Sequence, residues 1–179
     1  MRLFIAIPLP KEVKDYLYDL EKELVKLPAK FSLVSKKNLH ITLKFIPNAS
    51  ESQLEELKAR LSKIKFDSFK ISLIDKGIFP NSRNPRVIWV GLDSDDLLRK
   101  LQQEIDEKLL DLFSGSQEFT SHITLGRIKS IKNKETFDNE LKKISVESLK
   151  FNIDEFGLFK STLTKEGPIY TLIEKYKLD

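Results

Sequence analysis

The sequence contains no cysteine, a single tryptophan, a single methionine and only two histidines among its 179 residues. The absence of cysteine excludes disulfide bonds, a thiolate nucleophile and zinc sites built on cysteine, and it is compatible with a reducing cytosol. No H-E-x-x-H or comparable carboxylate spacing accompanies the histidines, so a metal site is not indicated either. We therefore expect neither a metal nor another cofactor.

Long apolar runs are also missing, because no stretch approaches the roughly 18 residues that a membrane-spanning helix requires. The opening MRLFIAIPLP is followed at once by the charged KEVKD, which is unlike a cleavable signal peptide. We expect a cytoplasmic protein with no membrane attachment. Its 31 basic and 27 acidic residues give a net charge of +4, which permits an anionic ligand such as RNA without demanding one.

Hydrophobic periodicity predicts an α+β protein. Apolar residues recur at helical spacing over 11–26, 50–64, 94–113 and 135–144, and Ser50 and Gln53 have the spacing of a capping box. Strand-like patterns cover 2–7, 31–34, 38–46, 66–74, 86–93, 119–128, 146–153, 156–163 and 168–176. The two halves share this rhythm, and no repeat of about 20 to 50 residues is present. We predict a single domain over residues 1–179, built from two similar lobes.

The two histidines occupy nearly the same phrase, LHITLKFI around His40 and SHITLGRI around His122. On a strand, alternate side chains share a face, so His40 lies with Thr42 and His122 lies with Thr124. The intervening apolar residues would pack into the two lobes. The economical arrangement is that the two polar faces meet across one cleft.

Two imidazoles and two hydroxyls in one cleft suit phosphodiester chemistry. A neutral histidine can accept a proton while a charged one donates a proton, and the hydroxyls can donate hydrogen bonds to phosphate oxygens. A single strand histidine is more often structural, satisfied by a backbone carbonyl, but the matched H-x-T settings favour a catalytic pair. A zinc site remains the weaker alternative, since two histidines supply only two ligands.

The paired motifs, His40-Ile41-Thr42 and His122-Ile123-Thr124, resemble the signature of the two-histidine (2H) phosphoesterases. Further segments resemble its RNA 2',3'-cyclic phosphodiesterase branch, also described as 2'-5' RNA ligases. They are RLFIAIPLP, NLHITLKF, FPNSRNPRVIWVGL, SHITLGRI and LFKSTLTKEGPIYTLI, in the order of the family. The chain departs from the pattern at Pro47, where a glycine is usual, and at Ser121, where a proline is frequent.

The resemblance implies a bilobal, pseudo-two-fold fold with two mainly antiparallel sheets, helices packed outside them and a central cleft. It implies hydrolysis of RNA 2',3'-cyclic phosphate ends to 2'-phosphomonoesters without a metal, with His40 and His122 as acid and base. The motifs are too symmetric to assign these two roles, although we lean towards His122 as the base. Thr42 and Thr124 would hold the phosphate oxygens.

By their place in the family pattern, Phe45 and Arg127 would contact the nucleobase or the phosphate. Both lie five residues after a histidine, and this odd offset puts them on the opposite strand face. A bulge at Gly126 would bring Arg127 back to the histidine face, whereas Phe45 has no such glycine and is otherwise a core aromatic. For Arg127 the alternative is a surface salt bridge. Trp89, in an apolar strand, is expected in the core.

The substrate could be an RNA with a cyclic phosphate end or a small cyclic nucleotide, and we expect a monomer. Arg83, Arg86 and Lys160 could guide an RNA backbone, although solvated surface charges are the simpler expectation. Two alternatives stay open: the same site could act as a 2'-5' RNA ligase, or the chain could be a non-catalytic RNA-end-binding module.

Overall fold

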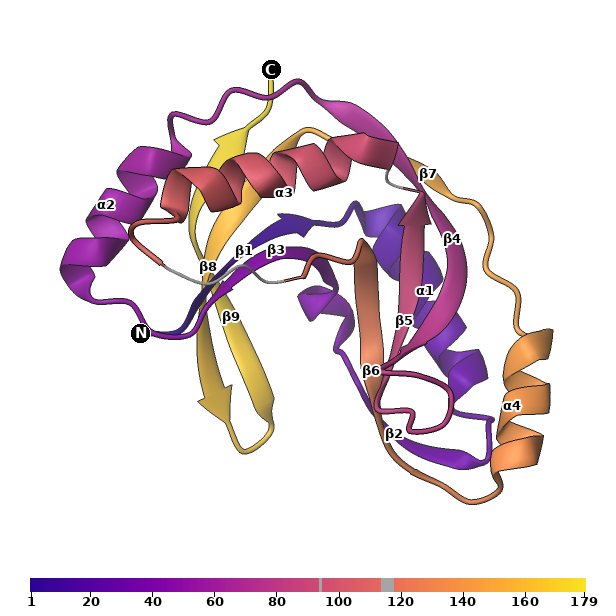
Figure 1. The fold of residues 1–179 in the computed structure, drawn as a ribbon. Coiled ribbons are helices and arrows are strands. Elements are labelled where there is room, and N and C mark those ends of the chain that lie inside the picture. Colours follow the sequence, from indigo (N-terminus) through magenta and orange to yellow (C-terminus); the bar gives the residue numbers. More distant parts are fainter. Residues whose placement is uncertain (94, 114–117) are drawn as a thin grey trace.

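The strands form one curled antiparallel sheet of nine strands that arches over an open side (Figure 1). The structure, a computed structural model, describes residues 1–93, 95–113 and 118–179. Strand order is β7-β4-β5-β6-β3-β1-β8-β9, and β2 also pairs with β6. The strands are β1 (Leu3–Pro8), β2 (Ala29–Leu33), β3 (His40–Ile46), β4 (Phe69–Phe79), β5 (Val87–Asp93), β6 (His122–Ile131), β7 (Lys150–Ile153), β8 (Glu155–Thr164) and β9 (Gly167–Lys177).

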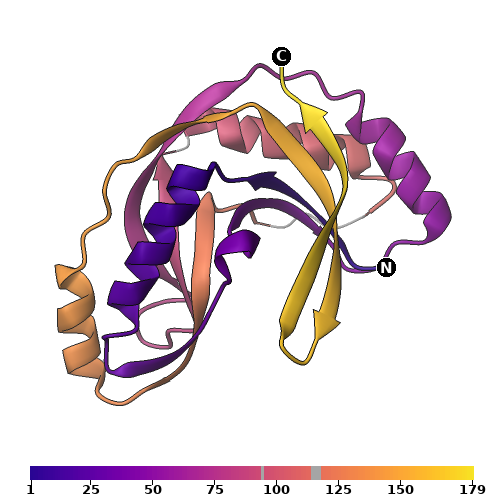
Figure 2. The same ribbon diagram turned by 180° about the vertical axis from the view of Figure 1, so that it is seen from behind.

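The four predicted helices are present in the described residues, together with a short 3-10 helix, η1 (Lys36–Asn38). They are α1 (Lys11–Leu24), α2 (Glu51–Leu61), α3 (Asp95–Leu109) and α4 (Lys134–Lys143), and the predicted start at Ser94 lies outside the described residues. The capping box of α2 forms as predicted, with Ser50 and Gln53 each bonding the other's backbone N–H. Figure 2 shows α1 against the β4–β6 half of the sheet, and α3 crosses the top of the arch. No helix of the described ranges has both the length and the apolar character needed to cross a membrane.

Strand pairing extends two strands beyond their predicted ends. Strand β4 runs on to Phe79, into the segment expected to be a loop, because Gly77 and Phe79 pair with Trp89 and Val87 of β5. Strand β6 continues to Ile131 because β2 pairs along it. Tertiary pairing therefore overrides the Gly, Pro and Lys content that suggested earlier ends.

The two sheets expected from the sequence are the two halves of this one sheet. They join where β3 meets β6, and the register there consists of the single pair Ile41 and Ile123. Both isoleucines are fully buried, and the adjoining strands β1 and β5 contribute buried apolar residues to the same core. The H-x-T motifs thus lie where the two halves of the molecule meet.

Candidate active site

The junction of β3 and β6 brings the two H-x-T motifs together. Because Ile41 pairs with Ile123 and the strands are antiparallel, the register places His40 opposite Thr124 and Thr42 opposite His122. These four side chains are half-buried on the face away from the two buried isoleucines, as the alternation predicted. Two imidazoles and two hydroxyls therefore share one surface.

Each imidazole is tethered in the same way. His40 Nδ1 lies 2.6 Å from the carbonyl oxygen of Asn38, and His122 Nδ1 lies 2.7 Å from the carbonyl oxygen of Thr120. A carbonyl only accepts, so Nδ1 must carry the hydrogen in both rings. In the neutral ring Nε2 is then the basic atom, and His40 Nε2 lies 2.9 Å from Thr42 Oγ1. The chain thus presents Nε2 of both histidines for proton transfer.

Burial lowers the pKa of both histidines below the usual value near 6.5. For His40 the loss of solvation is the largest cause, the Asn38 carbonyl opposes it, and the positive charges of Lys14 and His122 lower the pKa further. For His122 burial also lowers the pKa, and the Thr120 carbonyl opposes it. The charge of a protonated His122 disfavours a second proton on His40, so the pair does not hold two protons readily.

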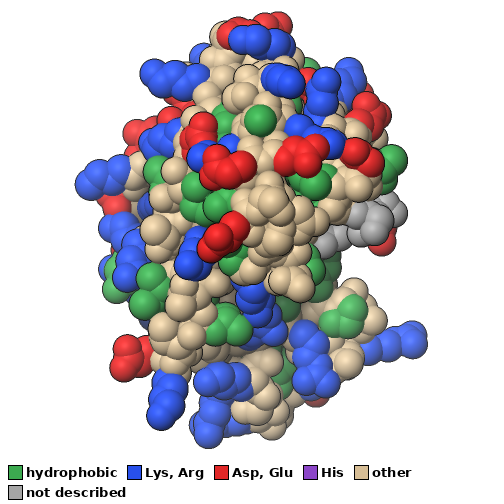
Figure 3. All heavy atoms as spheres, turned by 90° about the vertical axis from the view of Figure 1, so that its left-hand side faces the viewer, with side chains coloured by type: hydrophobic (Ala, Val, Ile, Leu, Met, Phe, Trp, Pro, Cys, Tyr) green, Lys and Arg blue, Asp and Glu red, His purple; other side chains and the backbone are tan. Residues whose placement is uncertain are grey.

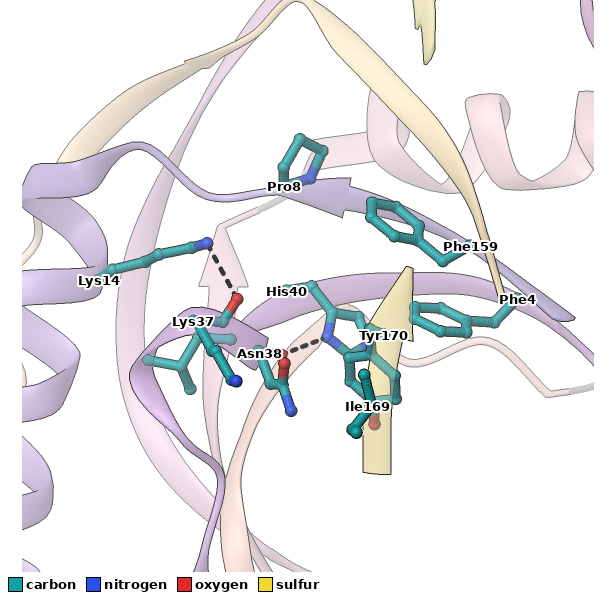
Figure 4. Close-up of a pocket in the computed structure, with 10 residues that line it drawn as sticks. Phe4, Pro8, Lys14, Lys37, Asn38, His40, Phe159, Ile169 and Tyr170 are labelled. Carbon is teal, nitrogen blue, oxygen red and sulfur yellow. Dashed lines mark hydrogen bonds between the residues drawn. The ribbon is translucent and has the colours of Figure 1, made fainter. Parts of the chain in front are cut away.

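A pocket of about 180 Å³ opens beside His40 (Figure 4). Its aromatic wall is made by Phe4, Phe159 and Tyr170: Phe4 lies 5.0 Å from the His40 ring, centroid to centroid, and 5.2 Å from Phe159. Tyr170 lies edge-on to His40 at 5.5 Å. Lys14 lines the opposite side and donates to the Lys37 carbonyl at 3.3 Å. The pocket therefore combines ring faces with cationic groups, as a nucleotide requires.

The tip of the β8–β9 hairpin helps to close this pocket. Asn38 Nδ2 donates to the Pro168 carbonyl at 3.1 Å, which links the hairpin to the turn that precedes His40. Ile169 and Tyr170 follow directly and line the pocket. Figure 3 shows lysine and arginine side chains predominating over the lower part of one face of the molecule, whereas acidic and basic side chains are mixed over the upper part.

The family model "LigT like Phosphoesterase" matches residues 7–89 and 90–170, and each of these segments contains one H-x-T motif. The chain belongs to the LigT-like phosphoesterases. The resemblance inferred from the two motifs and their flanking segments is therefore confirmed.

Among the similar proteins of this phosphoesterase family are two named RNA 2',3'-cyclic phosphodiesterase. That of Methanocaldococcus jannaschii is 39% identical, covering 98% of this chain and 100% of its own length. That of Archaeoglobus fulgidus is 38% identical, covering 95% and 96%. A crystal structure from Thermus thermophilus has a TM-score of 0.84 at 26% identity, covering 99% and 97%. The predicted α+β, two-lobed architecture is confirmed by this likeness.

In this LigT-like phosphoesterase, Phe45 is not a core aromatic. The β1–β3 register shifts by one residue, since Ile5 pairs with Lys44 but Ala6 pairs with Thr42. The extra residue is a β-bulge that reverses the alternation, so Phe45 returns to the face of His40. Its side chain is 52% exposed, and its ring lies 6.4 Å from that of Phe4.

A β-bulge also occurs in β6. Ile88 pairs with Gly126 but Trp89 pairs with Thr124, which leaves Leu125 as the extra residue. Arg127 is exposed on the histidine face. Burial raises the pKa of Tyr170, which lies next to His40, and the positive charge of Arg127 lowers that pKa, so the two side chains are near each other. The bulge expected at Gly126 is present, and the sequence had no signal for its counterpart in β3.

The sequence interpretation missed the pocket residues and misplaced Trp89. Phe4 and Tyr170 lie far from the motifs along the chain, and only the sheet order brings them to His40. Trp89 is only partly buried, and its ring lies 6.1 Å from that of His122 rather than in the core. Its position opposite Thr124 in β6 explains this, because paired residues share a face.

The remaining predicted residues lie at the surface. Arg83 and Arg86 are exposed in the loop between β4 and β5, and Lys160 is exposed on β8. A role of these three residues in guiding RNA stays a prediction. Within residues 1–93, 95–113 and 118–179, no three His, Asp or Glu side chains are grouped so as to hold a metal ion.

Proposed function

We propose that this chain hydrolyses RNA ends bearing a 2',3'-cyclic phosphate to 2'-phosphomonoesters, with His40 and His122 exchanging protons with the substrate. The observation that carries the proposal is the pair of imidazoles on adjoining strands, each tethered at Nδ1 to a backbone carbonyl. The full-length similarity to proteins named RNA 2',3'-cyclic phosphodiesterase supports the substrate class.

The pocket supports an assignment of acid and base. A terminal nucleoside seated against Phe159 and Tyr170 places its ribose on the His40 side of the phosphate. In-line attack then brings water from the His122 side. His122 Nε2 takes a proton from the water as the new P–O bond forms, the P–O3' bond breaks, and His40 Nε2 gives its proton to O3'. The phosphate remains on O2', and the two imidazoles regain their starting states through solvent.

The other site residues would stabilise the negative charge of the phosphate and orient the nucleotide. In this proposal Thr42 and Thr124 donate hydrogen bonds to the non-bridging phosphate oxygens, which gain negative charge in the transition state. Arg127 contacts the phosphate or the next phosphate along the strand, and the exposed ring of Phe45 contacts the nucleobase or ribose. Because each half supplies one histidine, one chain carries the whole site, and we propose a cytoplasmic monomer. The reaction needs no metal ion in this scheme.

Phosphorus NMR of the product from adenosine 2',3'-cyclic phosphate tests this proposal. We expect a single resonance of the 2'-monophosphate, with the same rate in the presence of EDTA. A 3'-monophosphate would reassign the leaving oxygen, and loss of activity with EDTA would show that a metal ion takes part. Binding without any product, for this compound and for an RNA oligonucleotide with the same end, would instead favour the non-catalytic binding module.

The pH dependence of kcat/KM is expected to be bell-shaped, with its maximum on the acid side of about 6.5. The rate falls at low pH as His122 becomes protonated and at high pH as His40 loses its proton. Burial lowers both pKa values, so both limbs move towards acid. Initial rates measured between pH 4.5 and 9 at low substrate concentration would check this.

Lys14→Met identifies the acid in the same measurement. The charge of Lys14 lowers the pKa of His40, so its removal should move the limb that belongs to His40 to higher pH. We expect the alkaline limb to move. Lys26→Met, at an exposed lysine just after α1, should leave the pH profile unchanged. Movement of the acid limb instead would make His40 the base.

A further inference from the structure

An aromatic surface also lies on the His122 side of the site. It is formed by Phe79 at the end of β4 and Trp89 in β5, whose rings are 4.9 Å apart, and Phe79 lies edge-on to His122 at 5.0 Å. Both side chains are only partly buried. In Figure 1, β4 and β5 lie on one side of β6, whereas β1, β8 and β9 lie on the far side of β3. Aromatic groups therefore flank the paired histidines on both sides.

Two glycines hold the indole of Trp89 flat on the sheet. A Cβ at Gly77, directly across in β4, would lie 2.1 Å from the indole ring, and a Cβ at Gly91 would lie 3.2 Å from it. One ring face is thus covered by backbone. The arrangement also leaves Nε1 buried without a hydrogen-bond partner, which costs folding free energy. The unpaired N–H therefore offsets part of the free energy that packing of the indole contributes.

The location of this surface matches the path of the nucleophile. His122 pairs with Gly91 and Thr124 pairs with Trp89, so the indole lies in the row directly beside the second motif. A phosphate held between the two imidazoles would have the Phe159 and Tyr170 rings on one side and the Phe79 and Trp89 rings on the other. Nucleobases stack on aromatic rings with little regard to sequence.

We infer that Phe79 and Trp89 form a second nucleobase-binding surface, on the opposite side of the phosphate from the terminal nucleoside. This inference rests on the proposed function. The second base belongs either to the preceding nucleotide of the same strand or to a separate nucleoside whose 5'-hydroxyl replaces water. In the second case the P–O5' bond forms, the P–O3' bond breaks, His122 takes the hydroxyl proton and His40 protonates O3', which leaves a 2'–5' linkage.

Three reactions of the wild type and of Trp89→Ala test the inference. They are hydrolysis of adenosine 2',3'-cyclic phosphate, hydrolysis of ApA ending in the same cyclic phosphate, and joining of the mononucleotide to the 5'-hydroxyl of adenosine. Loss of one stacked base should lower the rate about tenfold. We expect Trp89→Ala to lower the second or the third rate by that factor relative to the first, and the affected reaction identifies the source of the base. Trp89→Phe, which keeps a ring, should restore most of it.

The other outcomes overturn the inference. An equal loss in all three reactions would mean that Trp89 only supports the packing of His122, and no loss in any of them would mean that no base stacks there. Leu110→Ala, at an exposed apolar residue beyond α3, is the matched control and should change nothing. Failure of the wild type to open the mononucleotide would count against the proposed function itself, which separates the two cases.

Trp89 is the single tryptophan of the chain, so its fluorescence reports on this surface alone. His40→Asn should prevent turnover while the asparagine amide can still donate to the Asn38 carbonyl. In that variant, adenylyl-(2'→5')-adenosine should quench the emission saturably, whereas inorganic phosphate should not. Emission unchanged by the dinucleotide, at concentrations where it competes with adenosine 2',3'-cyclic phosphate for the wild type, would contradict stacking of a separate nucleoside on the indole.

Discussion

Replacing either His40 or His122 by alanine is expected to lower kcat for adenosine 2',3'-cyclic phosphate by about 10²- to 10⁴-fold. Each imidazole handles one of the two protons that must move, and His40 and His122 are the two histidines of the sequence. The double variant should be little worse than either single one, because the two groups act in a single step. Steady-state kinetics at saturating substrate would measure this.

Asparagine is the informative companion to alanine at each position. Its side-chain amide reaches about as far as Nδ1, so it can donate to the carbonyl of Asn38 or Thr120 but offers nothing in place of Nε2. His40→Asn and His122→Asn should therefore be as inactive as the alanine variants, with thermal unfolding close to that of the wild type. An asparagine variant within tenfold of wild-type kcat would rule out proton transfer by that histidine.

Replacing Lys44 by methionine is expected to lower the free energy of unfolding by about 3 kcal/mol. The Lys44 side chain is 4% exposed, and its Nζ lies 2.6 Å from Asp106 Oδ1 of α3. Gln102 Nε2 donates to the other carboxylate oxygen at 2.7 Å. Without Lys44, the partly buried carboxylate loses its cation, so α3 is held less firmly against β3. Urea unfolding monitored by circular dichroism would give the difference.

Two further variants separate the charge from the packing. Lys44→Met combined with Asp106→Leu should recover most of the lost stability, because a buried ion pair replaced by apolar groups is often neutral. Lys143→Met removes an exposed ion pair with Glu140 on α4, and it should cost less than about 1 kcal/mol. A loss as small as this for Lys44→Met alone would show that Asp106 needs no cation.

The sequence was sufficient to predict features that depend on local pattern. The helix of 50–64 was predicted from apolar spacing and from Ser50 and Gln53, and the half-buried histidines followed from strand alternation. Both are consequences of residues a few positions apart. The repeated H-I-T-L phrase added one long-range inference, that the two strands meet, and Ile41 does pair with Ile123.

Features that depend on strand order and backbone irregularity could not be predicted. Tyr170 reaches His40 only because β9 folds back on β8 beside β1, and Trp89 reaches His122 only because β5 pairs with β6. The bulge in β3 had no glycine to announce it. Phe45 was therefore placed by simple alternation on the buried face, which is wrong by one residue of register.

The two bulges also determine how much backbone must be copied when such a site is transferred to another protein. A designer who grafts only the three letters of each motif onto flat strands would obtain the imidazole and the hydroxyl, but the sixth residue would turn into the host core. The transferable unit is a six-residue backbone with one extra residue after the threonine, at Leu43 in one copy and Leu125 in the other. The position that follows tolerates residues as different as a buried lysine and a glycine, Lys44 and Gly126. What the two halves have in common is therefore the register shift after the threonine as well as the letters H-I-T-L.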